Sequence, residues 1–173
     1  MTGRPAPDEA AAYFQRYIAL VDGDDLEAGL QRPGIAVLVR DLEPALTSHA
    51  YAPGKWTLGQ SIQHVIDTER IFATRALRIA RGDQTPLPGY DQDTFAAVTG
   101  SRPLTALADE LERVRASTLD LFRSFMPDAL DRVGTSSGGP LSARAAGWII
   151  AGHERHHVAV TERYLEAVDL SRL

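Results

Sequence analysis

The 173-residue sequence contains no cysteine. This absence excludes disulfides, cysteine-based zinc or redox sites and a thiol nucleophile belonging to the chain itself. Any metal ion would therefore be held by nitrogen or oxygen ligands, and a thiol could take part only as an external molecule.

The sequence also has no excess of positive charge and no long apolar run. Its formal net charge is −5 at pH 7, so there is no basic field to hold nucleic acid or an anionic membrane. Met1 to Asp8 lacks the apolar core of a signal peptide, and the apolar runs are too short to cross a bilayer. We therefore expect a cytoplasmic protein with neither nucleic acid nor a membrane as a partner.

No useful stretch alternates apolar and polar residues at period two, so we predict no sheet. Apolar residues recur instead at helical spacing in four segments, at residues 25–48, 58–81, 103–126 and about 141–168. Pro33-Gly34 and Pro44 interrupt the first segment, which should be kinked or broken. The composition is ordinary for a globular protein, with 44% hydrophobic and 24% charged residues. The pattern predicts an all-α four-helix bundle.

Two further segments flank this bundle pattern. Residues 1–23 form an N-terminal extension with a short additional helix at 8–20, and the bundle occupies 24–173. Residues 83–102 make a Pro/Gly-rich connection with one short helical turn near 91–97, longer than two helices need. We expect Gln84–Thr99 to shape a pocket mouth. Tyr90, Asp91 and Asp93 are candidate substrate contacts, although a structural loop is the more frequent explanation. We read Thr135 to Pro140 as a loop.

Two histidines lie one turn apart in the last helical segment. On a helical wheel His153 and His157 fall at the centre of the apolar stripe, near Ile149, Ile150 and Tyr164. Burial of two imidazoles without partners is costly, because each brings polar nitrogens. A divalent metal ion would satisfy both, so this pair predicts a metal site.

Periodicity alone does not decide the role of two residues in the 58–81 segment. His64 lies about 130° from the centre of its apolar stripe, beside Ser61 and Thr68, so a ligand and a solvated histidine are equally compatible. Glu69 lies inside the stripe, where a carboxylate must pair with an arginine, support a ligand or bind metal itself; pairing is the most frequent.

The remaining histidines and the tryptophans are interpreted more simply. His156 and His49 are expected at the surface, and Trp56 and Trp148 in the core. The string His153-Glu154-Arg155-His156-His157 matches the H-E-x-x-H spacing of zinc proteases. The extended form of that motif requires a glycine where Val160 stands and a histidine where Arg163 stands, and no strand is predicted to hold a peptide. A protease is therefore disfavoured.

Two longer strings resemble the DinB/YfiT-like family of metal-binding helical bundles. They are Gly54-Lys-Trp-Thr-Leu-Gly-Gln-Ser-Ile-Gln-His64-Val-Ile-Asp-Thr-Glu69-Arg-Ile-Phe and Gly152-His153-Glu-Arg-His-His157. The connection through Arg81-Gly-Asp and Leu87-Pro-Gly-Tyr90 also agrees, so the resemblance covers roughly residues 24–168. It implies a four-helix bundle of unusual connectivity, often dimeric, with a metal triad that maps onto His64, His153 and His157. It assigns no ligand role to Glu154 or His156.

The resemblance also implies a chemistry. Three imidazoles leave open positions on Zn, Ni, Fe(II), Co or Mn, and ligand type does not choose among these metals. The family includes transferases and isomerases that use a low-molecular-weight thiol such as bacillithiol or mycothiol. We therefore expect a metal-dependent thiol S-transferase acting on a small-molecule substrate, and the resemblance also implies a homodimer. A non-catalytic metal-binding or stress-response protein and a metal-dependent hydrolase are the alternatives, and neither the pattern nor the resemblance assigns a catalytic residue.

Overall fold

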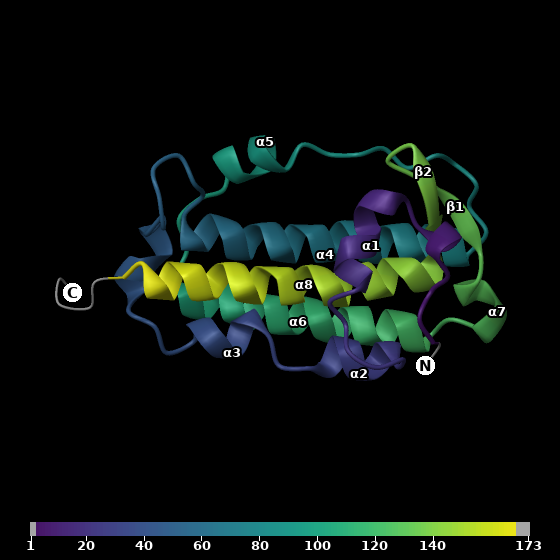
Figure 1. The fold of residues 1–173 in the computed structure, drawn as a ribbon, viewed down its shortest axis with the longest axis horizontal. Helices are drawn as coiled ribbons and strands as arrows, with labels where there is room; N and C mark the ends of the chain where they lie inside the picture. The colour runs from purple at the N-terminus through teal and green to yellow at the C-terminus, as the bar shows by residue number, and fades with distance from the viewer. Residues whose placement is uncertain (1–2, 169–173) are drawn as a thin grey trace.

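The computed structural model describes residues 3–168, and three long helices lie side by side in it (Figure 1). They are α4 (Leu58–Ala80), α6 (Leu104–Arg123) and α8 (Ala143–Glu166). The fourth position is filled by two short helices, α2 (Leu26–Gln31) and α3 (Ile35–Val39), which pack on α8 and α6. The predicted all-α four-helix bundle is confirmed, and its first segment is broken rather than one long helix.

The break in that first segment has a local cause. Pro33 and Gly34 follow α2, and Pro44 opens the 3-10 helix η2 (Pro44–Ser48). Proline removes a backbone donor and disfavours helix in the residue before it. Gly34 is also required by packing, because a Cβ there would lie 2.0 Å from Glu154 Oε1.

Helix α4 is the central element of the bundle, since it packs on both α6 and α8. Thr57 caps its N-terminus in a capping box with Gln60. The backbone N–H of Gln60 donates to Thr57 Oγ1 at 3.2 Å, and the backbone N–H of Thr57 donates to the side-chain oxygen Oε1 of Gln60 at 2.8 Å. Because neighbours cover two of its faces, α4 buries a polar row as well as its apolar stripe. This row comprises Ser61, His64, Thr68 and Arg75.

A small sheet contradicts the expectation of a protein without strands. Strands β1 (Val133–Ser136) and β2 (Gly139–Ser142) pair antiparallel, in register from Val133 with Ser142 to Ser136 with Gly139. Ser137 and Gly138 both have positive φ, 53° and 81°, as a tight two-residue hairpin turn requires. Each strand has only four residues, many of them Gly, Ser or Pro, which is too short for alternation to show.

The N-terminal segment packs against the bundle. It contains the 3-10 helix η1 (Pro7–Glu9) and α1 (Ala12–Ile18), the predicted short helix, which contacts α8 (Figure 1). Gly152 permits this approach, because a Cβ at that position would lie 1.9 Å from the Tyr17 carbonyl oxygen. Glu9 also accepts hydrogen bonds from Arg144 on α8.

Two short helices complete the chain. Helix α5 (Gln92–Ala97) lies in the long connection after α4, as predicted, and α7 (Pro127–Leu130) follows α6. Within residues 3–168, no helix combines the length and apolar character needed to cross a membrane.

Candidate metal centre

Three histidines from two helices converge in the buried part of the bundle. His64 on α4 and His153 and His157 on α8 each offer a ring nitrogen, and these three atoms lie within 4.8 Å of one another. The Nε2 atoms of His64 and His153 are 3.2 Å apart. Each of the three residues is no more than 8% exposed. In residues 3–168 no other group of three or more potential ligands is found.

Hydroxyl groups on α4 contact the far side of two of these rings. Ser61 Oγ lies 3.2 Å from His157 Nδ1, and Thr68 Oγ1 lies 3.5 Å from His64 Nδ1. Thr68 Oγ1 is in turn 2.6 Å from the Tyr90 hydroxyl. A hydroxyl that accepts from Nδ1–H selects the tautomer in which Nε2 keeps its lone pair. Ser61 and Thr68 therefore favour presentation of Nε2 toward the cluster.

Burial keeps all three rings neutral. Desolvation lowers the pKa of His64 to about 4 and that of His157 to about 3. The pKa of His153 is held well below its usual value by burial and by the neighbouring rings of His157 and His64. Neutral imidazoles have the lone pairs that a cation needs, whereas protonated rings would repel it.

The spacing of the donor atoms fits a divalent ion. Two nitrogens bound to zinc at about 2.0–2.1 Å with a tetrahedral angle would be separated by about 3.3 Å. The observed distance of 3.2 Å between His64 Nε2 and His153 Nε2 is close to this value. The residues present therefore fit a three-nitrogen metal site, with room for an external ligand on the side where a cavity opens.

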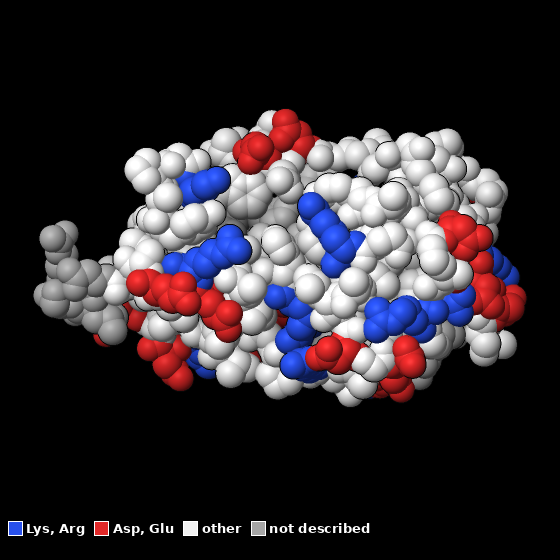
Figure 2. Space-filling view, in the orientation of Figure 1, with Lys and Arg blue, Asp and Glu red and all other residues white. Residues whose placement is uncertain are grey.

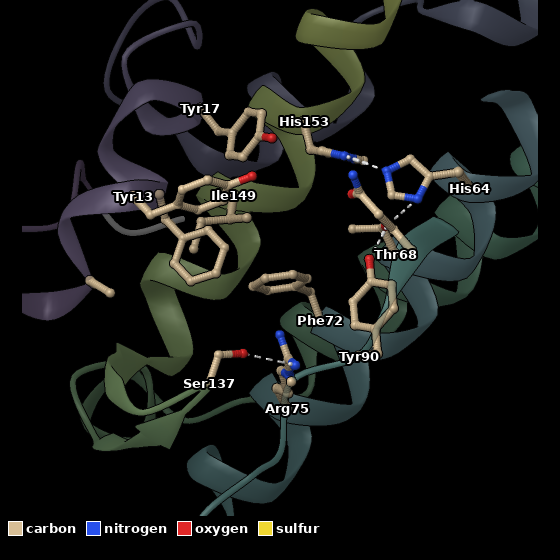
Figure 3. Close-up of a pocket in the computed structure, with 14 residues that line it drawn as sticks. Tyr13, Tyr17, His64, Thr68, Phe72, Arg75, Tyr90, Ser137, Ile149 and His153 are labelled. Atoms are coloured by element: carbon tan, nitrogen blue, oxygen red, sulfur yellow. Dashed lines mark hydrogen bonds between the residues drawn. The ribbon is translucent and has the colours of Figure 1, made fainter. Parts of the chain in front are cut away.

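That cavity has a volume of about 400 Å³ and reaches His64 and His153. Figure 3 shows these two histidines at one end and Arg75 and Ser137 at the other. The lining residues come from α1 and the residue before it, from α4, α8 and the hairpin, and from the connection before α5 and the first residue of α5: Ala11, Tyr13, Phe14, Tyr17, His64, Thr68, Phe72, Arg75, Gly89, Tyr90, Gln92, Ser137, Ile149 and His153. None of these fourteen described residues has a carboxylate.

Glu69 has the role that the sequence favoured for it. Its two oxygens accept hydrogen bonds from Arg115 on α6 at 2.9 and 2.8 Å. Arg115 also pairs with Glu154 at 2.8 Å, and Glu154 accepts from the backbone amide of Ile35 at 3.2 Å. Glu69 and Glu154 are thus held by a shared arginine, and neither belongs to the histidine cluster.

Arg115 was not predicted, although the sequence carries a signal for it. Arg115 follows Leu111 by four residues and precedes Thr118 by three, which places it on the apolar face of α6. A cation on that face, like the carboxylate of Glu69 on α4, required a buried partner.

The other candidate residues are distributed around the site. His156 is exposed, as expected, whereas His49 and Trp56 are half-buried, and the Trp56 ring lies 5.0 Å from that of His64. Trp148 is fully buried, as predicted for a core residue. Tyr90 lines the cavity, as expected of the pocket mouth.

The two aspartates near Tyr90 do not line this cavity. Asp91 caps α5, because its side chain accepts from the amides of Asp93 at 2.9 Å and Thr94 at 3.1 Å. Asp93 is exposed. In the space-filling view the molecule is hollowed below acidic side chains that lie over α5 (Figure 2).

The contribution of the N-terminal segment to the site was not predicted. Tyr13, Phe14 and Tyr17 of α1 form an aromatic wall of the cavity, and the Tyr17 ring packs 5.2 Å from that of His153. The family resemblance did not extend to this segment, and its aromatic residues alone indicated only a short helix.

Comparison with known sequences agrees with the geometry. Residues 30–160 match the DinB superfamily. A protein of Oceanobacillus iheyensis is 26% identical over 124 residues, covering 70% of this chain and 71% of the relative. A protein of Bacillus mycoides is 25% identical over 128 residues, covering 72% and 73%. Both relatives are named "Putative metal-dependent hydrolase".

Solved structures show the same fold. YfiT from Bacillus subtilis superposes with a TM-score of 0.67 at 17% identity, covering 95% of this chain and 93% of YfiT. It is described as "a probable metal-dependent hydrolase with an unusual four-helix bundle topology". A DinB-like protein from the same organism superposes with a TM-score of 0.50 at 15% identity, covering 90% and 87%.

Proposed function

This chain belongs to the DinB superfamily, and from that premise we propose that it is a metal-dependent transferase that uses an external low-molecular-weight thiol. His64, His153 and His157 would hold the divalent ion. When bound, such an ion supplies Lewis acidity, which lowers the pKa of a thiol or water that it coordinates. Ser61 and Thr68 orient two of the imidazoles, and Tyr17 and Trp56 pack beside His153 and His64.

The observation that carries this proposal is the pairing of a neutral donor set with an aromatic cavity whose described lining has no carboxylate. Three neutral imidazoles do not compensate the charge of a divalent ion, so an anionic thiolate is favoured there. A thiol ordinarily loses its proton near pH 8.5, so it needs less help from a general base than water does. The chain has no cysteine, so that thiol must enter from outside.

Hydrolysis is the second candidate, favoured by the names of the relatives and by the donor set itself. A three-histidine zinc site can lower the pKa of bound water to about 7. In that case the cavity would hold an ester or amide, and turnover would need metal but no thiol. The two candidate functions therefore differ in whether turnover requires an added thiol, which is simple to measure.

The test is a panel of small thiols and electrophilic acceptors, with metal-loaded and chelated protein compared at equal concentration. Thiol transfer predicts product formation that requires both the metal and the thiol. Ester or amide cleavage by loaded protein without a thiol would support hydrolysis instead. Activity that survives chelation would contradict metal-dependent catalysis, whereas metal binding without thiol binding or any turnover would leave a non-catalytic metal-binding protein.

A further inference from the structure

Arg75 lies at the end of the cavity opposite the histidine cluster (Figure 3). The residue is only 4% exposed. Its guanidinium donates to the Pro88 carbonyl oxygen at 2.8 Å and to Ser137 Oγ at 3.4 Å, and lies 4.7 Å from the Phe72 ring centroid. Among the described residues no carboxylate forms an ion pair with it, whereas Arg115 pairs with both Glu69 and Glu154.

A buried cation without an acidic partner is costly, and burial lowers the pKa of Arg75. Both of these hydrogen bonds use one terminal nitrogen of Arg75, Nη2. A guanidinium has five N–H donors in a planar fork that suits an anion such as a carboxylate or phosphate. The protein therefore provides acceptors for only some of the N–H donors of Arg75, and the others are free to bind a ligand in this cavity.

The same helix connects this arginine to the histidine cluster. His64, Thr68, Phe72 and Arg75 line the cavity from α4, and their spacings of four, four and three residues place them on one face. His64 and Arg75 are eleven positions apart on this helix, a rise of about 16 Å. The cavity between them is walled largely by aromatic rings, from Tyr13, Phe14, Tyr17, Phe72 and Tyr90.

We propose that Arg75 is the specificity-determining residue of this cavity and selects a small organic anion. The ligand would place its carboxylate or another anionic group on the guanidinium, its apolar or aromatic part against the rings, and its reactive end toward His64 and His153. The inference rests on the proposed function for the chemistry at that reactive end. The anion site itself depends only on Arg75 and the cavity.

Binding of matched ligands to chelated protein tests this assignment. The probes are 4-phenylbutanoate and its uncharged amide, measured by titration calorimetry in the same buffer. We expect the carboxylate to bind about tenfold more tightly than the amide, as a charge-assisted hydrogen bond to a buried cation would give. Because no metal is present, a failure here is separable from a failure of thiol transfer.

Two variants make the test specific to Arg75. Arg75→Gln should reduce the preference for the carboxylate to less than about twofold while the amide binds as before. Arg81→Gln removes an exposed cation at the C-terminus of the same helix and should retain the tenfold preference. Thermal melting should show that both variants are folded. Equal binding of the two probes to the parent protein, no binding of the carboxylate, or a preference that survives Arg75→Gln would overturn the proposal.

Discussion

His64 Nε2 and His153 Nε2 face each other at 3.2 Å, although 89 positions separate the two residues in the chain. Packing of α4 against α8 brings them together. Each ring is buried and neutral, so in the absence of a cation one of them must donate to the other. A metal ion would use both lone pairs at once, and this relationship is the basis of the proposed site.

Acidification should destabilise the chelated protein before the carboxylates titrate. The pKa values of His64 and His157, about 4 and about 3, lie below the ordinary value of 6.5. The unfolded chain therefore binds more protons as the pH falls below 6.5, and stability present above that pH is lost toward pH 4. The slope should approach about 1.4 kcal/mol per pH unit for each such histidine.

Urea denaturation at several pH values between 7 and 4.5 measures this slope. The variant His157→Gln should show a smaller slope than the parent chain over the same range. An unfolding free energy that stays constant from pH 7 to pH 5 would show that the histidines titrate normally in the folded protein.

Replacement of Arg115 should be strongly destabilising. Arg115→Met would leave Glu69 and Glu154 buried without their shared cation, a change that typically costs about 3–5 kcal/mol. Arg113→Met, an exposed substitution on the same helix, should have little effect. Denaturant midpoints compare the two variants, and similar midpoints would mean that the carboxylates find other partners.

Gly152→Ala should disturb the contact between α1 and α8. The added methyl would lie 1.9 Å from the Tyr17 carbonyl oxygen, which is backbone and cannot rotate away. We expect a loss of about 1–3 kcal/mol in unfolding free energy, or displacement of α1 from the cavity. Gly100→Ala is the control, because a Cβ there meets nothing within 4 Å. Equal stability of the two variants would contradict this packing.

Helical periodicity was sufficient to predict the bundle and the burial of the histidine pair on α8. It was insufficient to predict the burial of His64, because a helical wheel assumes one buried face, whereas neighbouring helices cover two faces of α4. The row with Ser61, Thr68 and Arg75 therefore looked like a boundary from the sequence and is buried in the fold. The family resemblance, and not the pattern, singled out His64.

Two other features depend on tertiary contacts that local patterns do not encode. The hairpin is stabilised partly by Leu87, whose amide donates to Thr135 O and whose carbonyl accepts from the Ser137 amide, both at 2.9 Å. The aromatic wall from α1 depends on the close approach at Gly152. Neither contact could be inferred from residues adjacent in the chain.

The most direct test of the account is the metal content of purified protein and its single-histidine variants. Elemental analysis after dialysis should find about one divalent ion per chain in the parent protein, as one site with three histidine ligands would hold. His64→Ala, His153→Ala and His157→Ala should each lose it, whereas His156→Ala, which removes an exposed imidazole from the same turn of α8, should retain it. Loss of the metal in His156→Ala, or its retention in His153→Ala, would contradict the three-histidine centre.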